Sequence, residues 1–192
     1  MADFKTLRQQ DRLRKRAIEA RQKLTAYERD IASEKIADAV IRSTWFQRSQ
    51  NVACYLSTQF EVDTWRIIAR AWTMKKRVFA PVCGKNHKIR FREVTSNSDL
   101  DKDRHGILVP RNGKTIDPGR LDLVITPLVA FDGDNNRIGM GGGYFDRTFS
   151  FLKHREHLYH PKLIGVAFAC QKIDEIASNP WDVPLFTVVS DS

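Results

Sequence analysis

Asn51-Val-Ala-Cys-Tyr-Leu56 and Arg77-Val-Phe-Ala-Pro-Val82 are short apolar runs, and each predicts a buried β-strand. Between them, apolar residues recur at helical spacing from Trp65 to Trp72, and Asp63 is the predicted N-cap of that helix. Connections this short between a strand, a helix and a strand predict a right-handed parallel crossover. The unit therefore indicates an α/β fold around a parallel sheet.

The flanking segments continue this alternation. Residues 5–24 predict a basic helix, and Thr25 with Glu28 forms a capping-box pattern that begins a second helix at about residue 26. Apolar runs predict further strands at residues 88–94, 121–126, 163–168 and 186–189. We therefore predict an α/β three-layer sandwich with a mostly parallel sheet.

The remaining segments complete a single domain over residues 1–192. A helix is predicted at residues 144–154, after a turn rich in glycine. Residues 95–120 are polar and rich in turn-forming residues, and long loops of this kind are often functional. No internal repeat or linker divides the chain.

Composition excludes several classes of protein. The chain of 192 residues is 42% hydrophobic, and no apolar run approaches the roughly 20 residues that cross a bilayer. Because the apolar core of a signal peptide is also missing, we expect a cytoplasmic protein with no membrane partner. Cys54, Cys83 and Cys170 form no C-x-x-C pair, which argues against zinc and redox motifs and predicts buried, reduced thiols.

The net charge of +9 is concentrated in residues 1–50, which hold 12 Lys and Arg against 7 Asp and Glu. Such an excess fits nucleic acid, an acidic membrane surface, or small polyanions such as nucleotide phosphates and polyglutamate. The basic residues between Arg12 and Arg16 spread around several faces of a helix, and no RNA-binding motif accompanies them. Composition alone leaves these partners open.

The most informative motif is Arg137-Ile-Gly-Met-Gly-Gly-Gly-Tyr-Phe-Asp-Arg147. It lies between an apolar strand and a helix, and a helix N-terminus exposes unpaired N–H groups. Glycines let these groups approach an anion closely, so the arrangement predicts a phosphate-binding loop. The alternative is a tight turn whose glycines only permit close packing.

Familiar nucleotide and calcium motifs do not fit this segment. It lacks the Gly-Lys-Ser/Thr ending of a P-loop, and Tyr144 stands where G-x-G-x-x-G requires its last glycine. Asp132 begins a run similar to a calcium loop, but Arg137 and Gly143 occupy positions that require glycine and glutamate.

Charged residues flank the glycines. Arg137 and Arg147 are suited to bidentate contacts with phosphate. Asp146 would either hold magnesium beside the phosphates or only favour the start of the helix, and the residues alone leave both roles open.

The same region resembles the signature of a known family. Leu121–Asp132 followed by Arg137–Arg147 is similar to the strand, Phe-Asp, Arg-Leu-Gly, glycine-rich turn and Tyr-Tyr-Asp-Arg of the 5-formyltetrahydrofolate cyclo-ligase family, also called methenyltetrahydrofolate synthetase. Other segments agree in order, namely Arg14 ahead of Thr25, Tyr55-Leu-Ser57 with Glu61-Val-Asp-Thr64, Leu163–Phe168, and Trp181-Asp-Val-Pro184. The resemblance runs from about residue 12 to residue 190.

This resemblance implies a fold related to sugar-isomerase and CoA-transferase sheets. It also implies a ligase that uses ATP and magnesium to convert 5-formyltetrahydrofolate to 5,10-methenyltetrahydrofolate, ADP and phosphate. In that reaction the formyl oxygen attacks the γ-phosphate to give an imino-phosphate, and N10 then attacks the same carbon as phosphate leaves. The expected partners are 5-formyltetrahydrofolate, its polyglutamates and ATP, and we expect a monomer.

The resemblance further implies a role for each matching residue. The catalytic residues would be Arg14, Arg137 and Tyr144. The ATP site would comprise Arg14, Arg137, Ile138, Gly139, Met140, Gly141, Gly142, Gly143, Tyr144 and Phe145. The substrate site would comprise Leu56, Glu61, Met140, Gly141, Gly142, Gly143 and Tyr144. Asp146 and Asp182 would hold magnesium.

The chain departs from the family pattern at four positions, which are Gln10 and Gly142 in place of Lys, Phe145 in place of Tyr, and His105 in place of an aromatic residue. We therefore expect the phosphate site to use Arg14, Arg137 and one further basic residue. The first two departures leave open a catalytically weak relative that only binds folate. A basic protein associated with nucleic acid is the second alternative.

Overall fold

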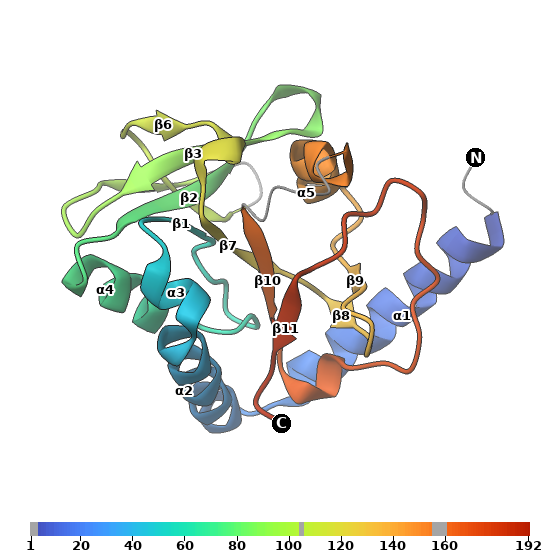
Figure 1. Cartoon of the computed structure of the whole chain (residues 1–192). Helices are drawn as coiled ribbons and strands as arrows, with labels where there is room; N and C mark the ends of the chain where they lie inside the picture. The colour runs from blue at the N-terminus through green and yellow to red at the C-terminus, as the bar shows by residue number, and fades with distance from the viewer. Residues whose placement is uncertain (1–3, 104–105, 155–160) are drawn as a thin grey trace.

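A seven-stranded sheet with the order β11-β10-β7-β1-β2-β3-β6 forms the centre of the protein. The computed structural model describes residues 4–103, 106–154 and 161–192 (Figure 1). The strands of the sheet are β1 (Asn51–Cys54), β2 (Arg77–Cys83), β3 (Ile89–Val94), β6 (Thr115–Ile116), β7 (Leu123–Pro127), β10 (Lys162–Val166) and β11 (Thr187–Val189). Neighbouring strands from β11 to β2 are parallel, whereas β3 pairs antiparallel with β2 and β6. The predicted α/β fold with a mostly parallel sheet is confirmed.

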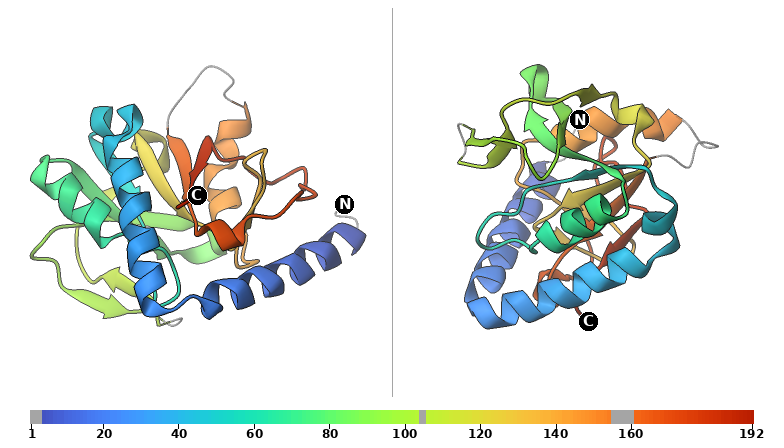
Figure 2. Two further views of the ribbon diagram at one scale, coloured as in Figure 1. Left: turned by 90° about the horizontal axis from the view of Figure 1, so that it is seen from below. Right: turned by 90° about the vertical axis from the view of Figure 1, so that its left-hand side faces the viewer.

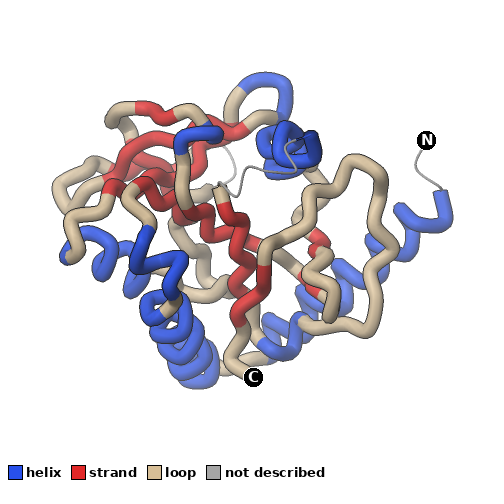
Figure 3. The backbone as a smooth tube through the Cα atoms, viewed as in Figure 1, coloured by secondary structure: helices blue, strands red, loops and turns tan. Residues whose placement is uncertain are grey.

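Helices cover both faces of this sheet (Figure 3). One face packs against α2 (Ala26–Arg42), α3 (Thr44–Arg48) and α4 (Trp65–Thr73), and the other against α5 (Tyr144–Phe149) and the 3₁₀ turn η3 (Ser150–His154). The capping box predicted at the start of α2 is present, because the Thr25 and Glu28 side chains each accept a hydrogen bond from the other residue's backbone N–H.

Strand β1 illustrates how the sheet separates two cores. Val52 and Cys54 belong to the core that contains Ile36 of α2, whereas Ala53 belongs to the core that contains Phe149 of α5. Successive side chains of a strand point to opposite faces, so both faces of β1 are apolar. This double burial explains why the strand is an almost uninterrupted apolar run.

Helix α1 (Phe4–Lys23) runs away from α2 and along the C-terminal part of the chain (Figure 1 and Figure 2). It contacts the hairpin of β8 (Ala130–Phe131) and β9 (Arg137–Ile138), and the 3₁₀ turn η4 (Ala169–Gln171). Ala17 is buried in this contact. No helix of the described residues is long and apolar enough to span a bilayer.

Several predicted boundaries are corrected. The N-cap of α4 is Thr64 rather than Asp63, although the Asp63 carboxylate accepts a hydrogen bond from the Trp65 N–H at 3.0 Å. The helix predicted at residues 144–154 is α-helical only to Phe149 and ends as η3.

The polar segment at residues 95–120 contains more regular structure than predicted. It forms the hairpin of β4 (Leu100–Lys102) and β5 (Leu108–Pro110), strand β6, and the 3₁₀ turn η2 (Pro118–Arg120). A further 3₁₀ turn, η1 (Lys85–His87), joins β2 to β3. His105, one of the departures from the family pattern, lies outside the described residues.

The prediction of three buried thiols is also wrong. Cys54 is buried, and burial raises the pKa of its thiol to about 12. Cys83 and Cys170 are exposed, because each lies where its strand or turn reaches the surface.

Candidate functional site

A cavity of about 350 Å³ opens at the carboxyl ends of the parallel strands β1, β2 and β7. This edge is the usual ligand site of an open α/β sheet. Leu56 follows β1, Cys83 ends β2 and Leu128 follows β7, and all three line the cavity. The other walls come from α1, the β4–β5 hairpin, residues 137–146 and residues 179–182. Every residue that the sequence predicted for the ATP, substrate or metal sites lines this cavity.

The glycine-rich loop lines the cavity with a backbone whose N–H groups are not used by the described residues. Gly141 has φ 90° and Gly143 has φ 62°, conformations that strongly favour glycine. The amides of residues 140–143 donate no hydrogen bond to any described part of the chain. The loop therefore retains donors for an anion, which the tight-turn alternative does not require.

Two arginines hold the carbonyl groups of this loop. Arg14 Nε donates to the Gly139 carbonyl at 2.8 Å, and Arg147 Nη1 donates to the Gly142 carbonyl at 2.6 Å. The guanidinium of Arg14 also pairs with Asp11. These bonds fix the loop through its acceptors and leave its donors available.

Arg137 is bound within the protein. Its side chain is only 6% exposed, and Nη2 donates to Asp146 Oδ1 at 2.7 Å. Nη1 donates to the Val183 carbonyl, and the Val183 N–H donates to Asp146 Oδ1 at 3.1 Å. Arg137 therefore joins the glycine loop, α5 and the C-terminal segment, while the ATP contact predicted for it stays a prediction.

Asp146 and Asp182 both line the cavity, and each uses one carboxylate oxygen within the protein. Asp146 Oδ1 is held by Arg137, and Asp182 Oδ2 accepts from the Asn179 N–H at 2.7 Å. Among the described residues, no hydrogen bond reaches the second oxygen of either carboxylate. The same part of the chain holds no group of three or more His, Cys, Asp or Glu suited to a metal. Two open carboxylate oxygens fit Mg²⁺, which completes its shell with substrate oxygens and water.

Leu56 and Glu61 lie in the segment between β1 and α4. Leu56 is buried, and Glu61 Oε2 accepts hydrogen bonds from the N–H and hydroxyl of Thr58 at 2.9 and 2.8 Å. These bonds orient the carboxylate at the cavity wall. Tyr55 is buried beneath it, and burial together with the negative charge of Glu61 raises the pKa of the Tyr55 phenol.

Known proteins resemble this chain over nearly its whole length. The sequence model of the 5-formyltetrahydrofolate cyclo-ligase family matches residues 6–191. The chain belongs to this family. The 5-formyltetrahydrofolate cyclo-ligase of Haemophilus influenzae is 32% identical over 186 residues, 95% of this chain and 96% of the relative. The one from Escherichia coli K12 is 36% identical over 148 residues, 75% and 79% of the two chains.

A solved structure agrees with this assignment to the cyclo-ligase family. The Aquifex aeolicus 5,10-methenyltetrahydrofolate synthetase shares 28% identity and a TM-score of 0.80, covering 95% of this chain and 89% of its own. The chain is therefore an enzyme of the ligase class, as the resemblance in its motifs implied.

The structure accounts for two departures from the cyclo-ligase pattern. The buried Gln10 side chain donates to the Ala177 carbonyl at 2.8 Å, so it ties α1 to the C-terminal segment. Phe145 stacks on Phe149 with ring centroids 6.1 Å apart, an apolar contact that needs no hydroxyl.

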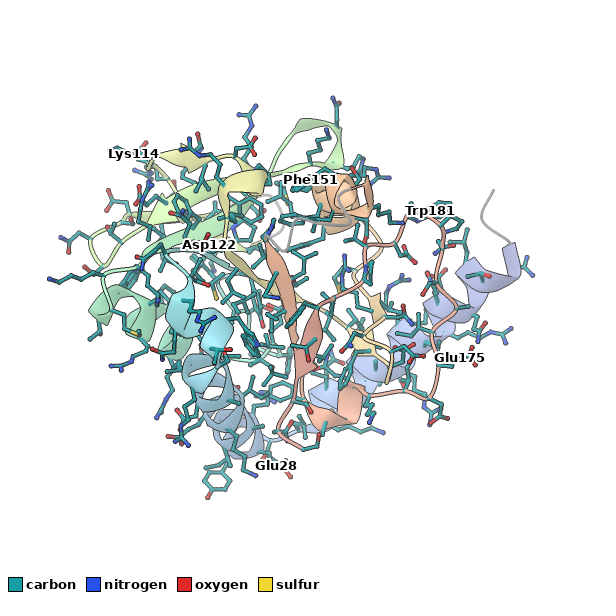
Figure 4. All side chains as sticks on the ribbon, viewed as in Figure 1. Glu28, Lys114, Asp122, Phe151, Glu175 and Trp181 are labelled. Carbon is teal, nitrogen blue, oxygen red and sulfur yellow. The ribbon has the colours of Figure 1, made fainter. Side chains whose placement is uncertain are left out.

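The sequence did not identify two further residues of the cyclo-ligase cavity, Arg21 and Trp181. Trp181 is 48% exposed and lies on the loop that passes over α1 (Figure 4). Arg21 shares one helical face with Arg14 and Gln10. Its spacing of seven residues from Arg14 was the sequence signal that could have placed it in the site. Among the described residues, the arginines that line the cavity are Arg14, Arg21 and Arg137, and no lysine lines it.

Proposed function

We propose that this protein catalyses the ATP- and magnesium-dependent cyclisation of 5-formyltetrahydrofolate to 5,10-methenyltetrahydrofolate, with release of ADP and phosphate. One observation carries the proposal: a single cavity is lined by the open amides of the glycine loop, by Arg14, by two carboxylates and by the Leu56–Glu61 wall. Family membership supports the same reaction.

The glycine-loop end of the cavity would bind the triphosphate. The amides of residues 140–143 would donate to the phosphates, and Arg14 adds a positive charge beside Gly141. Asp146 and Asp182 would hold the magnesium ion, which when bound neutralises phosphate charge during transfer. Arg137 keeps Asp146 in place through the hydrogen bond to Oδ1.

The Leu56–Glu61 end would bind the pterin. Glu61 accepts hydrogen bonds from pterin N–H groups, and Leu56 contacts the ring. The formyl oxygen then attacks the γ-phosphorus and ADP leaves, which gives the imino-phosphate. N10 attacks the formyl carbon and gives up its proton, the carbon–oxygen bond breaks, and phosphate leaves with that proton as the ring closes.

The protein contributes positioning and electrostatic stabilisation to this sequence. Tyr144 follows the glycine loop and would act beside the transferred phosphate; its ring centroid lies 5.2 Å from that of His87. The Tyr144 carbonyl accepts a hydrogen bond from the Thr148 hydroxyl at 2.6 Å, which fixes the first turn of α5.

The deciding experiment follows the near-ultraviolet absorbance of the methenyl product. The full-length protein is mixed with 5-formyltetrahydrofolate and ATP, with and without magnesium. We expect product only when all three are present. Folate binding without turnover would favour a folate reservoir, and tight RNA or DNA binding with a steep salt dependence would favour a nucleic-acid partner.

We further propose a cytoplasmic monomer that accepts polyglutamated substrate. The positive charge of the chain supports the last point, since a polyglutamate tail adds negative charges. Measuring turnover of 5-formyltetrahydrofolate with one glutamate and with several glutamates tests the preference for a polyglutamate tail.

A further inference from the structure

Arg21 is the unusual side chain of the cavity. Among the residues that the structure describes, its Nε is the only buried side-chain nitrogen or oxygen without a hydrogen-bond partner. The same part of the chain offers Arg21 no ion pair. Arg21 as a whole is partly buried, but an Nε–H group removed from water without an acceptor is unfavourable. Its position at the cavity wall indicates that a ligand supplies the acceptor.

Arg21 and Arg14 serve different parts of the cavity. Both belong to α1, and seven residues of helix separate them by about 10 Å. Arg14 is bound to the glycine loop through the Gly139 carbonyl. Arg21 therefore lies two helical turns away from the predicted phosphate-binding end.

Arg21 lines the same cavity as Tyr55 and Glu61. The pKa of the Tyr55 phenol is raised by burial first and by the negative charge of Glu61 next, while the positive charge of Arg21 opposes this rise. Both charges thus act on the same buried phenol, whose hydroxyl donates to the Val62 carbonyl at 3.1 Å. Glu61 and Arg21 line one cavity without forming an ion pair with each other.

We propose that Arg21 is a substrate-binding residue that donates to the 4-oxo oxygen of the pterin. This inference rests on the proposed function. On the pterin ring, the 2-amino group and N3–H are adjacent donors, and the 4-oxo oxygen beside them is an acceptor. A carboxylate and a guanidinium that line the same cavity match this edge, with Glu61 accepting from the donors and Arg21 donating to the oxygen.

A neutral carbonyl suits this position better than the glutamate tail of folate. The tail carboxylates are negative, and the negative charge of Glu61 would repel them. The 4-oxo group satisfies the donor of Arg21 without adding an anion near Glu61. Arg21 would thereby select 4-oxo pterins over 4-amino pterins, which present a donor at the same place.

The test compares Arg21→Met with Arg16→Met, which removes the same charge from an exposed position on α1. The methionine keeps the aliphatic stem and removes the donors. We expect KM for 5-formyltetrahydrofolate to rise between about 10- and 100-fold in Arg21→Met, with KM for ATP unchanged. Arg16→Met should match the wild type, and Arg21→Lys should recover part of the loss.

Discrimination between ligands gives the decisive readout. The wild type should bind the 4-oxo substrate more tightly than its 4-amino analogue, and Arg21→Met should lose this preference. An unchanged preference in Arg21→Met would overturn the proposal. It would also be overturned if the variant bound 5-formyltetrahydropteroate, which lacks the glutamate tail, as well as the wild type does. Wild-type protein without turnover would instead contradict the proposed function.

A stability measurement separates substrate binding from a structural role. Because the Nε of Arg21 has no partner among the described residues, Arg21→Met should unfold at the same urea concentration as the wild type or a higher one. Saturating 5-formyltetrahydrofolate should raise the midpoint less for the variant than for the wild type. A variant that is destabilised without ligand and stabilised equally by it would contradict the assignment.

Discussion

Two turns on either side of β9 use similar small and polar residues in opposite ways. In the turn at residues 132–136, the buried Asp132 carboxylate accepts hydrogen bonds from the Asp134 and Asn136 N–H groups, the Asn136 side chain and the Ile176 N–H. In the loop at residues 140–143, no amide donates to the described protein. One turn is closed by its own carboxylate, and the other is open.

This difference separates a structural turn from a candidate binding loop. The closed turn satisfies the Asp134 and Asn136 N–H groups with an acceptor from within, so these donors are not open to a ligand. The open loop is held by arginines whose hydrogen bonds to it go to carbonyl groups, so it is ordered while its donors stay available. The hydrogen bonding of the backbone N–H groups therefore identifies a binding loop better than the glycine content does.

The largest effect is expected from opening the closed turn. Asp132→Ala removes the acceptor for four hydrogen bonds at a buried position, and we expect the free energy of unfolding to fall by about 3 kcal/mol or more. Urea denaturation measures this free energy. The value for Asp132→Asn, which keeps one acceptor oxygen, should lie between those of Asp132→Ala and the wild type. Turnover per folded molecule should stay within a fewfold of the wild type. Loss of turnover without loss of stability would show that the turn has a role in catalysis.

The next effect concerns the proposed metal ligand. Asp146→Asn keeps an oxygen for Arg137 but removes the negative charge, so turnover should fall about a hundredfold while folate affinity changes little. The exposed Asp134→Asn in the closed turn is the matched control and should leave turnover unchanged. Turnover of Asp146→Asn equal to the wild type at saturating magnesium would remove Asp146 from the site.

A smaller effect is expected within the open loop. Gly141→Ala forces a side chain onto a backbone with φ 90°, a strain of about 1–3 kcal/mol, so ATP affinity should weaken about tenfold. Gly133→Ala in the closed turn is the control, because no atom lies within 4 Å of the added carbon and its φ is outside the left-handed region. Titration of ATP by calorimetry compares them. Equal affinities would show that the conformation of Gly141 is not needed for nucleotide binding.

The smallest effect should follow from Arg147→Met. This change removes one exposed hydrogen bond to the Gly142 carbonyl, worth about 1 kcal/mol at most, so KM for ATP should rise only a fewfold. Steady-state kinetics with ATP as the varied substrate measure it. A hundredfold rise would mean that Arg147 contacts the nucleotide directly and does more than hold the loop.

Most of the sheet and the position of the loop were predictable because they depend on local pattern. Two-sided burial makes strands such as Asn51–Cys54 apolar, and a run of glycines before a helix marks a backbone that needs their conformational freedom. The role of Asp132 was not predictable, since the same spacing of carboxylates begins a calcium loop, and only the fold shows that its oxygens are occupied.

Arg21 escaped prediction for a different reason. It is one of several basic residues on α1, and sequence gives no means of deciding which of them faces a cavity that other segments complete. The hydrogen bond between Gln10 and Ala177 spans 167 residues and is equally invisible in local pattern. Local sequence pattern does not show which distant segments α1 packs against.

That placement has a consequence for synthesis on the ribosome. Helix α1 emerges early, yet its docking surfaces, including Ile138 and Ile176, are translated much later. The nascent chain must therefore hold an unpacked amphipathic segment until Ile176 has been translated. Affinity for either substrate would consequently arise only after residues 179–182, which line the cavity, have left the ribosome.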